Sequence, residues 1–70
     1  MGDTSVFVGE TYVAMGNTYN TMKDYANTLD NYQKAYEIYR VTNGEDFSTT
    51  QKLKEWIVIL KEKVKNSSRK

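Results

Sequence analysis

Side chains that could carry out acid–base, nucleophilic or metal chemistry are sparse in this chain. Its 70 residues include no histidine and no cysteine, so the commonest general base at neutral pH and the thiolate nucleophile are absent. The sequence has no glycine-rich phosphate loop and no spacing typical of a metal site. Asp24 and Asp30 are six residues apart and would point to different sides of a helix. We therefore expect no enzyme activity, no cofactor and no bound metal ion.

Two adjacent acidic residues, Glu45 and Asp46, follow Gly44 and allow two interpretations. Carboxylates in a loop can hold a cation. They can also lie in a solvated turn, where their charge favours the start of the next helix. We favour the solvated turn, which leaves binding rather than catalysis as the function to consider.

Apolar and aromatic residues recur at helical spacing along most of the chain. With a turn of about 100° per residue, they form two stripes. A short polar break near Lys23 separates the stripes and predicts an antiparallel helical hairpin. Gly16 lies beside the first stripe, where a missing side chain would allow the second helix to approach closely. The stripes consist of Val8, Tyr12, Met15, Tyr19 and Met22, and of Tyr25, Leu29, Tyr32, Tyr36 and Tyr39 with Thr28 and Ala35 beside them.

The order of these residues resembles the tetratricopeptide repeat, a helix–turn–helix unit of about 34 residues. Thr28 stands where that family usually has Ala, Lys23 where it often has Gly, and Arg40 where it often has Pro. Without the Pro, the second helix is expected to continue to about Thr42. The resemblance implies a fragment of a right-handed α-α superhelix that binds proteins. Its signature residues are Tyr12, Met15, Gly16, Tyr19, Thr28, Tyr32, Ala35 and, in the later part of the chain, Trp56.

The later part of the chain resembles the longer repeats of kinesin light chains, with a Gly-x-Asp loop before a polar helix start at Ser48. A shift of 41 residues places Leu53, Trp56, Ile57 and Leu60 on the positions of Tyr12, Met15, Gly16 and Tyr19. The chain therefore holds about one and a half repeats. We predict one all-α domain over residues 1–70, a hairpin plus a third, capping helix. The expected helices are Thr4–Met22, Lys23–Thr42 and Ser48–Asn66.

The resemblance also implies which face binds a partner. In such repeats one face of the first helix lines a concave groove, where Asn side chains often bond the backbone of an extended peptide. We expect a protein or peptide partner with acidic groups there, and the alternative is a solvated face without a ligand. The candidate residues are Glu10, Val13, Asn17 and Asn20 on the first helix, and Lys54, Val58 and Lys61 on the third.

Basic residues gather at the C-terminal end. Residues 61–70 hold five basic side chains and one acidic one, whereas residues 1–60 hold five basic and eight acidic ones. Such asymmetry occurs in nucleic-acid-binding segments, but cations also offset the dipole of a helix C-terminus. We favour the second interpretation because no aromatic residue lies among these lysines. Nucleic acid is therefore not the expected partner, and residues 66–70 are expected to be a flexible tail.

Two further expectations concern the surroundings of the protein. The chain has no apolar run near 18 residues and no basic N-terminal segment followed by an apolar one. We therefore expect no membrane association and a cytoplasmic location, with the nucleus as the alternative.

The third segment carries an apolar stripe that would lack its usual mate, a fourth helix. It could close a monomeric three-helix bundle with the hairpin, which we favour, or pack on or exchange with a second copy in a homodimer. In the bundle, Phe7, Val13 and Val58 would remain outside. Trp56 is expected to pack near Ala35, Ile38 or Tyr39. The stripe consists of Leu53, Ile57, Leu60 and Val64.

Overall fold

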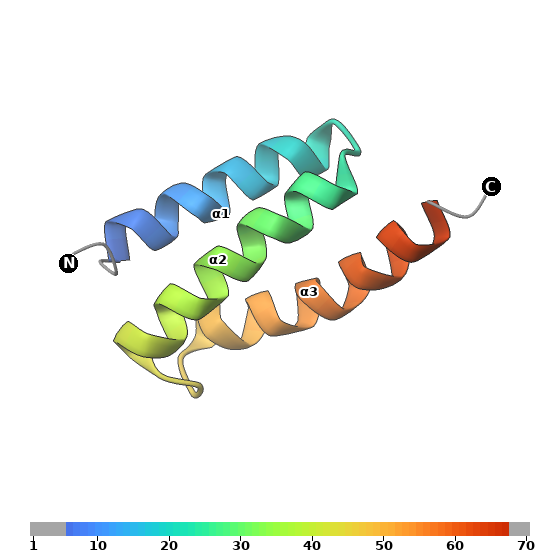
Figure 1. The fold of residues 1–70 in the computed structure, drawn as a ribbon. Helices are drawn as coiled ribbons and strands as arrows, with labels where there is room; N and C mark the ends of the chain where they lie inside the picture. Colours follow the sequence, from blue (N-terminus) through green and yellow to red (C-terminus); the bar gives the residue numbers. More distant parts are fainter. Residues whose placement is uncertain (1–5, 68–70) are drawn as a thin grey trace.

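Three α-helices make up the described part of the chain. The computed structural model describes residues 6–67, which contain no strand. The helices are α1 (Val6–Thr21), α2 (Tyr25–Asn43) and α3 (Ser48–Ser67). Figure 1 shows α1 and α2 as an antiparallel pair, with α3 on the other side of α2. This arrangement confirms the predicted all-α fold, a helical hairpin followed by a third helix.

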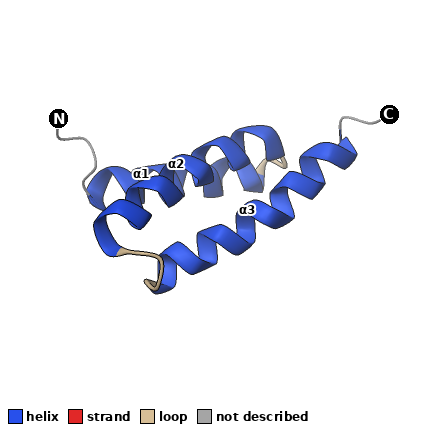
Figure 2. Cartoon of the chain, turned by 60° about the horizontal axis from the view of Figure 1, so that its bottom comes forward, coloured by secondary structure: helices blue, strands red, loops and turns tan. Residues whose placement is uncertain are grey.

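The described part of the chain is open rather than closed into a bundle. α2 packs against both other helices, whereas no Cα atom of α1 lies within 8 Å of a Cα atom of α3 among residues 6–67. Figure 2 shows α3 running beneath the hairpin at an angle to it. The favoured expectation of a closed three-helix bundle is therefore wrong, because α3 packs on α2 alone.

The turn between α1 and α2 explains why α2 begins two residues later than predicted. Lys23 has a φ of 61°, a left-handed conformation that a helix cannot contain. Asp24 follows as the N-cap, and its carboxylate accepts hydrogen bonds from the backbone N–H and the side-chain amide of Asn27. At the other end, the N–H of Gly44 donates to the carbonyls of Tyr39 and Arg40 and closes α2. The predicted start of α1 at Thr4 lies outside the described residues.

Two glycines bring α1 close to α2. Gly9 and Gly16 are the buried residues of α1, and their spacing of seven places them on one face of the helix. A Cβ on Gly16 would lie 2.5 Å from two carbon atoms of the Tyr32 ring. A Cβ on Gly9 would lie 3.1 Å from the ring of Tyr39. The two tyrosine rings therefore occupy the space where α1 lacks side chains.

The buried face of α1 is rotated from the predicted stripe. Val13 packs against the core, as Tyr12 does. Met15 and Met22, predicted to face α2, are 39% and 59% exposed. The predicted positions of Val13, Met15 and Met22 are therefore wrong, because the two glycines rather than the larger apolar residues must face the tyrosine rings.

The core lies between α2 and α3. Leu53 and Ala35 are completely buried, and α2 supplies the mate that the third apolar stripe seemed to lack. Burial of each large apolar side chain stabilises the fold by roughly 1.5–3 kcal/mol. Phe47, in the connecting loop, stacks on Tyr39 with the ring centroids 5.9 Å apart. The buried cluster consists of Tyr32, Ala35, Tyr39, Leu53, Ile57 and Leu60.

Two fully buried threonines differ in the partners of their hydroxyl groups. The Thr28 hydroxyl donates to the carbonyl of Asp24 at 2.8 Å. The Thr50 hydroxyl has no hydrogen-bond partner among the described residues. A buried polar group without a partner costs roughly 1–3 kcal/mol, so Thr50 is a weak point of the core.

The close approach at Gly16 can be tested by substitution. Gly16→Leu should lower the free energy of unfolding by about 1–3 kcal/mol or more, because the new side chain competes with the Tyr32 ring. Ala14→Leu adds a similar group to an exposed site of α1 and should change it by less than about 0.5 kcal/mol. Urea denaturation measures both variants. Equal effects at the two positions would contradict the packing described here.

The two threonines provide a matched pair for a second test. Thr50→Val should raise the free energy of unfolding by about 1 kcal/mol, because it removes an unpaired hydroxyl and keeps the side-chain shape. Thr28→Val should lower it by about 1 kcal/mol, because it removes a hydrogen bond. Thermal melting gives the sign of each change, and destabilisation by Thr50→Val would show that its hydroxyl has a partner.

Candidate functional site

The seven candidate binding residues do not share one face. Val13 is partly buried and packs against the core. Glu10 is exposed. Burial raises the pKa of Tyr39, and the negative charge of Glu10 raises it further. Asn17 and Asn20 line a groove between α1 and α3. The three candidates from α3 line a different groove, between α2 and α3, and these are Lys54, Val58 and Lys61.

The groove between α1 and α3 encloses about 330 Å³. Tyr32 of α2 and Leu60 of α3 are its buried members, and the more exposed residues form its walls. The α1 wall consists of Asn17 and Asn20, and the α3 wall consists of Trp56, Ile59 and Lys63. Amide, indole, aliphatic and ammonium groups therefore line one hollow.

Tyr32 connects the parts of this groove. Its side chain is 5% exposed, and its ring lies against Gly16 of α1. Its hydroxyl donates a hydrogen bond to Oδ1 of Asn17. Burial raises the pKa of the Tyr32 hydroxyl above the usual 10.0, so the group is protonated and remains a donor at neutral pH. Because the Asn17 oxygen accepts this bond, the Asn17 amide nitrogen, which has no partner among the described residues, can donate to a ligand.

Trp56 forms the apolar wall opposite Asn17. Its ring centroid is 5.4 Å from that of Tyr32, with the planes tilted by 33°, and 38% of its surface is exposed. Trp56 packs on α2 as predicted, but its ring partner is Tyr32 rather than Ala35, Ile38 or Tyr39. Trp56 lies beside the core stripe of α3 and not within it, at the edge where α3 borders the groove. Ile59, one turn further along α3, is 52% exposed and extends the apolar surface.

The positive charge of the groove comes from Lys63. Its Nζ lies 5.3 Å from the centroid of the Tyr25 ring, a cation–π contact that holds the ammonium near the first residue of α2. The sequence interpretation missed Trp56, Ile59 and Lys63 as groove residues. Their spacing of three, four and seven places them on one face of a helix, and that signal was available in the sequence.

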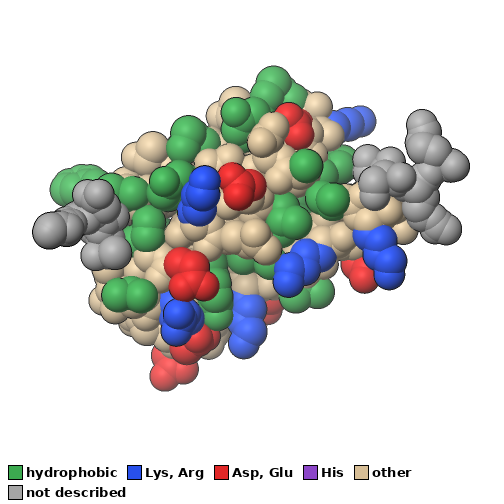
Figure 3. Space-filling view, in the orientation of Figure 1, with side chains coloured by type: hydrophobic (Ala, Val, Ile, Leu, Met, Phe, Trp, Pro, Cys, Tyr) green, Lys and Arg blue, Asp and Glu red, His purple; other side chains and the backbone are tan. Residues whose placement is uncertain are grey.

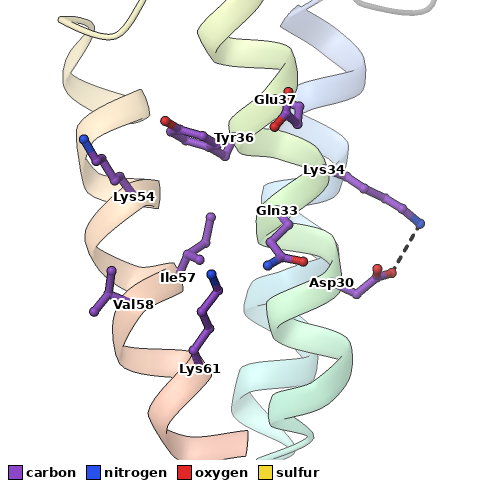
Figure 4. Close-up of a pocket in the computed structure, with 9 residues that line it drawn as sticks. All are labelled: Asp30, Gln33, Lys34, Tyr36, Glu37, Lys54, Ile57, Val58 and Lys61. Atoms are coloured by element: carbon purple, nitrogen blue, oxygen red, sulfur yellow. Dashed lines mark ion pairs between the residues drawn. The ribbon is translucent and has the colours of Figure 1, made fainter.

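The groove between α2 and α3 is larger, about 560 Å³. Figure 4 shows Tyr36 reaching from α2 towards α3, and Lys61 lying between the two helices. The Tyr36 hydroxyl donates to the Glu45 carboxylate at 3.2 Å, and burial followed by the charge of Glu45 raises the pKa of Tyr36. Ile57 is almost buried in this groove, whereas Val58 is 60% exposed.

The loop carboxylate that could hold a cation has protein partners instead. Glu45 accepts the hydrogen bond from Tyr36 and lies 4.0 Å from Nε of Arg40. Arg40 also forms an ion pair with Glu37 at 3.0 Å. Through these contacts, Glu45 holds the loop against α2. Residues 6–67 hold no group of three or more side chains that could bind a metal ion.

Comparisons of the chain with protein-family models, curated protein sequences and solved structures gave no match. Within the described part of the chain, no helix has the length and apolar character needed to span a membrane.

Proposed function

We propose that this chain is a protein-binding module that holds an extended peptide in the groove between α1 and α3. The proposal rests on the Tyr32–Asn17 hydrogen bond, which lies beside the partly exposed ring of Trp56. The bond orients an amide donor towards a ligand, and the ring offers an apolar surface. Orientation before binding reduces the conformational entropy that a ligand would otherwise have to offset.

The chemistry of the walls indicates which peptide would bind. Asn17, Asn20 and Lys63 offer donors, which suit backbone carbonyl and carboxylate oxygens. Trp56 and Ile59 suit an apolar side chain. The groove therefore fits a short segment in which acidic and apolar residues alternate, because successive side chains of an extended peptide point to opposite sides. The resemblance to tetratricopeptide repeats supports the same class of function.

Self-association through α3 is the alternative that the sequence left open. Self-association was considered because the apolar stripe of α3 was expected to lack a helix to pack against. In the structure, α2 covers most of that stripe within the chain. Exchange or pairing of third helices would therefore replace contacts that already exist. We retain peptide binding as the proposal.

A pair of synthetic peptides tests the proposal. The acetylated pentapeptides ELELE and KLKLK have the same length and apolar content and opposite charge. ELELE should change the fluorescence of Trp56, the single tryptophan, and shift the side-chain amide signals of Asn17 and Asn20 in NMR spectra. KLKLK should bind at least tenfold more weakly. An equal response to both peptides, or none to either, would contradict the proposal.

The role of the Tyr32–Asn17 bond can be tested by a double-mutant cycle with ELELE. Asn17→Ala and Tyr32→Phe should each weaken binding about 3–10-fold, the worth of one hydrogen bond. The double variant should be little weaker than either single variant, because both remove the same oriented donor. Asn66→Ala, at an exposed site outside the groove, serves as the control. Independent, multiplicative losses would show that Tyr32 does not act through Asn17.

A further inference from the structure

The second groove lies on the opposite face of α3 from the first. At about 100° per residue, Lys54, Val58 and Lys61 share one face of the helix, and the residues of the first groove share the face opposite. The core stripe lies between these faces. A ligand in one groove therefore leaves the other groove open.

We propose that the groove between α2 and α3 docks an amphipathic helix of a partner protein, with acidic side chains along the edge that faces α3. The lining residues of the groove span 30–37 on α2 and 54–61 on α3, about two turns or 11 Å of each helix. Its apolar surface comes from Ile57, Val58 and the ring of Tyr36. An apolar strip between two helical ridges is the geometry of helix-in-groove recognition.

The two rims of this groove differ in charge. On the α2 rim, Asp30 is paired with Lys34 at 3.2 Å, and Figure 4 shows this pair on the side of α2 away from α3. On the α3 rim, Lys54 and Lys61 form no ion pair with any described residue. Figure 3 shows lysine and arginine side chains along the edge that α3 occupies. The α3 rim therefore offers two free cations, two helical turns apart.

This charge pattern selects the occupant. Acidic residues seven apart on a docked helix would lie opposite Lys54 and Lys61, while its apolar face covers Val58. A second copy of this chain fits less well. Antiparallel pairing of two α3 helices at Val58 would bring Lys54 of one copy close to both Lys61 and the exposed Glu62 of the other, so repulsion and attraction offset each other. A partner with an acidic edge instead gains an attraction at both lysines.

Two designed 18-residue peptides test the inference. Both have leucine at helical spacing on one face and alanine elsewhere, and the residues that flank the leucines are Glu in one peptide and Lys in the other. By calorimetry, the Glu peptide should bind the intact chain at least tenfold more tightly than the Lys peptide. In NMR spectra, binding should shift the signals of Tyr36, Ile57 and Val58 and leave that of the Trp56 indole unchanged.

Charge reversal separates specific docking from general attraction. Lys54→Glu combined with Lys61→Glu should reverse the preference between the two peptides. Lys23→Glu combined with Lys52→Glu makes the same change in net charge away from the groove and should leave the preference unchanged. Asn17→Ala should also have no effect, so the outcome is independent of the peptide site in the first groove. Equal binding of both peptides, no binding of either, or equal effects of the two double variants would overturn the inference.

Discussion

The contact between the Tyr32 ring and the bare backbone at Gly16 is the constraint on which the rest of this structure depends. Glycine inside a helix costs about 1 kcal/mol relative to alanine. Here it allows a large aromatic ring to lie where a Cβ would stand, 2.5 Å from two ring carbons. The same ring also contacts the ring of Trp56 on α3. Its hydroxyl donates a hydrogen bond to Asn17 on α1. One side chain of the central helix thus contacts both outer helices and sets their positions relative to each other.

The two grooves follow from this arrangement. Because α1 and α3 both pack on α2 and not on each other, a hollow remains between them, with Tyr32 at its base. The second groove opens where α3 diverges beside α2. α3 is buried along one stripe and keeps two exposed faces. One bears the indole of Trp56, and the other bears two lysines that form no ion pair within residues 6–67. A chain of this size can therefore present two chemically different surfaces.

Periodicity in the sequence was enough to predict three helices, the hairpin and the role of Gly16, because these depend on local spacing. It did not predict the rotation of α1, because Met15 and Gly9 lie on different faces of α1 and either face could pack against α2. The positions of the Tyr32 and Tyr39 rings decide between these faces. The sequence also predicted that Lys54, Val58 and Lys61 share a face with Asn17. That prediction assumed that residues 41 positions apart on α1 and α3 face the same side of the molecule. The helical spacing of Trp56, Ile59 and Lys63 pointed to the correct face. A buried hydroxyl without a hydrogen-bond partner, such as that of Thr50, depends on the packing of two helices and leaves no pattern in the sequence.

The most direct measurement is a nuclear Overhauser experiment on the Tyr32 ring protons. We expect contacts from this one ring to the α protons of Gly16 and to the indole protons of Trp56, in the same sample at low concentration. Contacts to Gly16 without contacts to Trp56 would contradict the placement of α3 and the groove beside it. A ring that contacts neither residue, or a Met15 side chain that contacts α2 in place of Gly16, would show that Tyr32 does not position the outer helices.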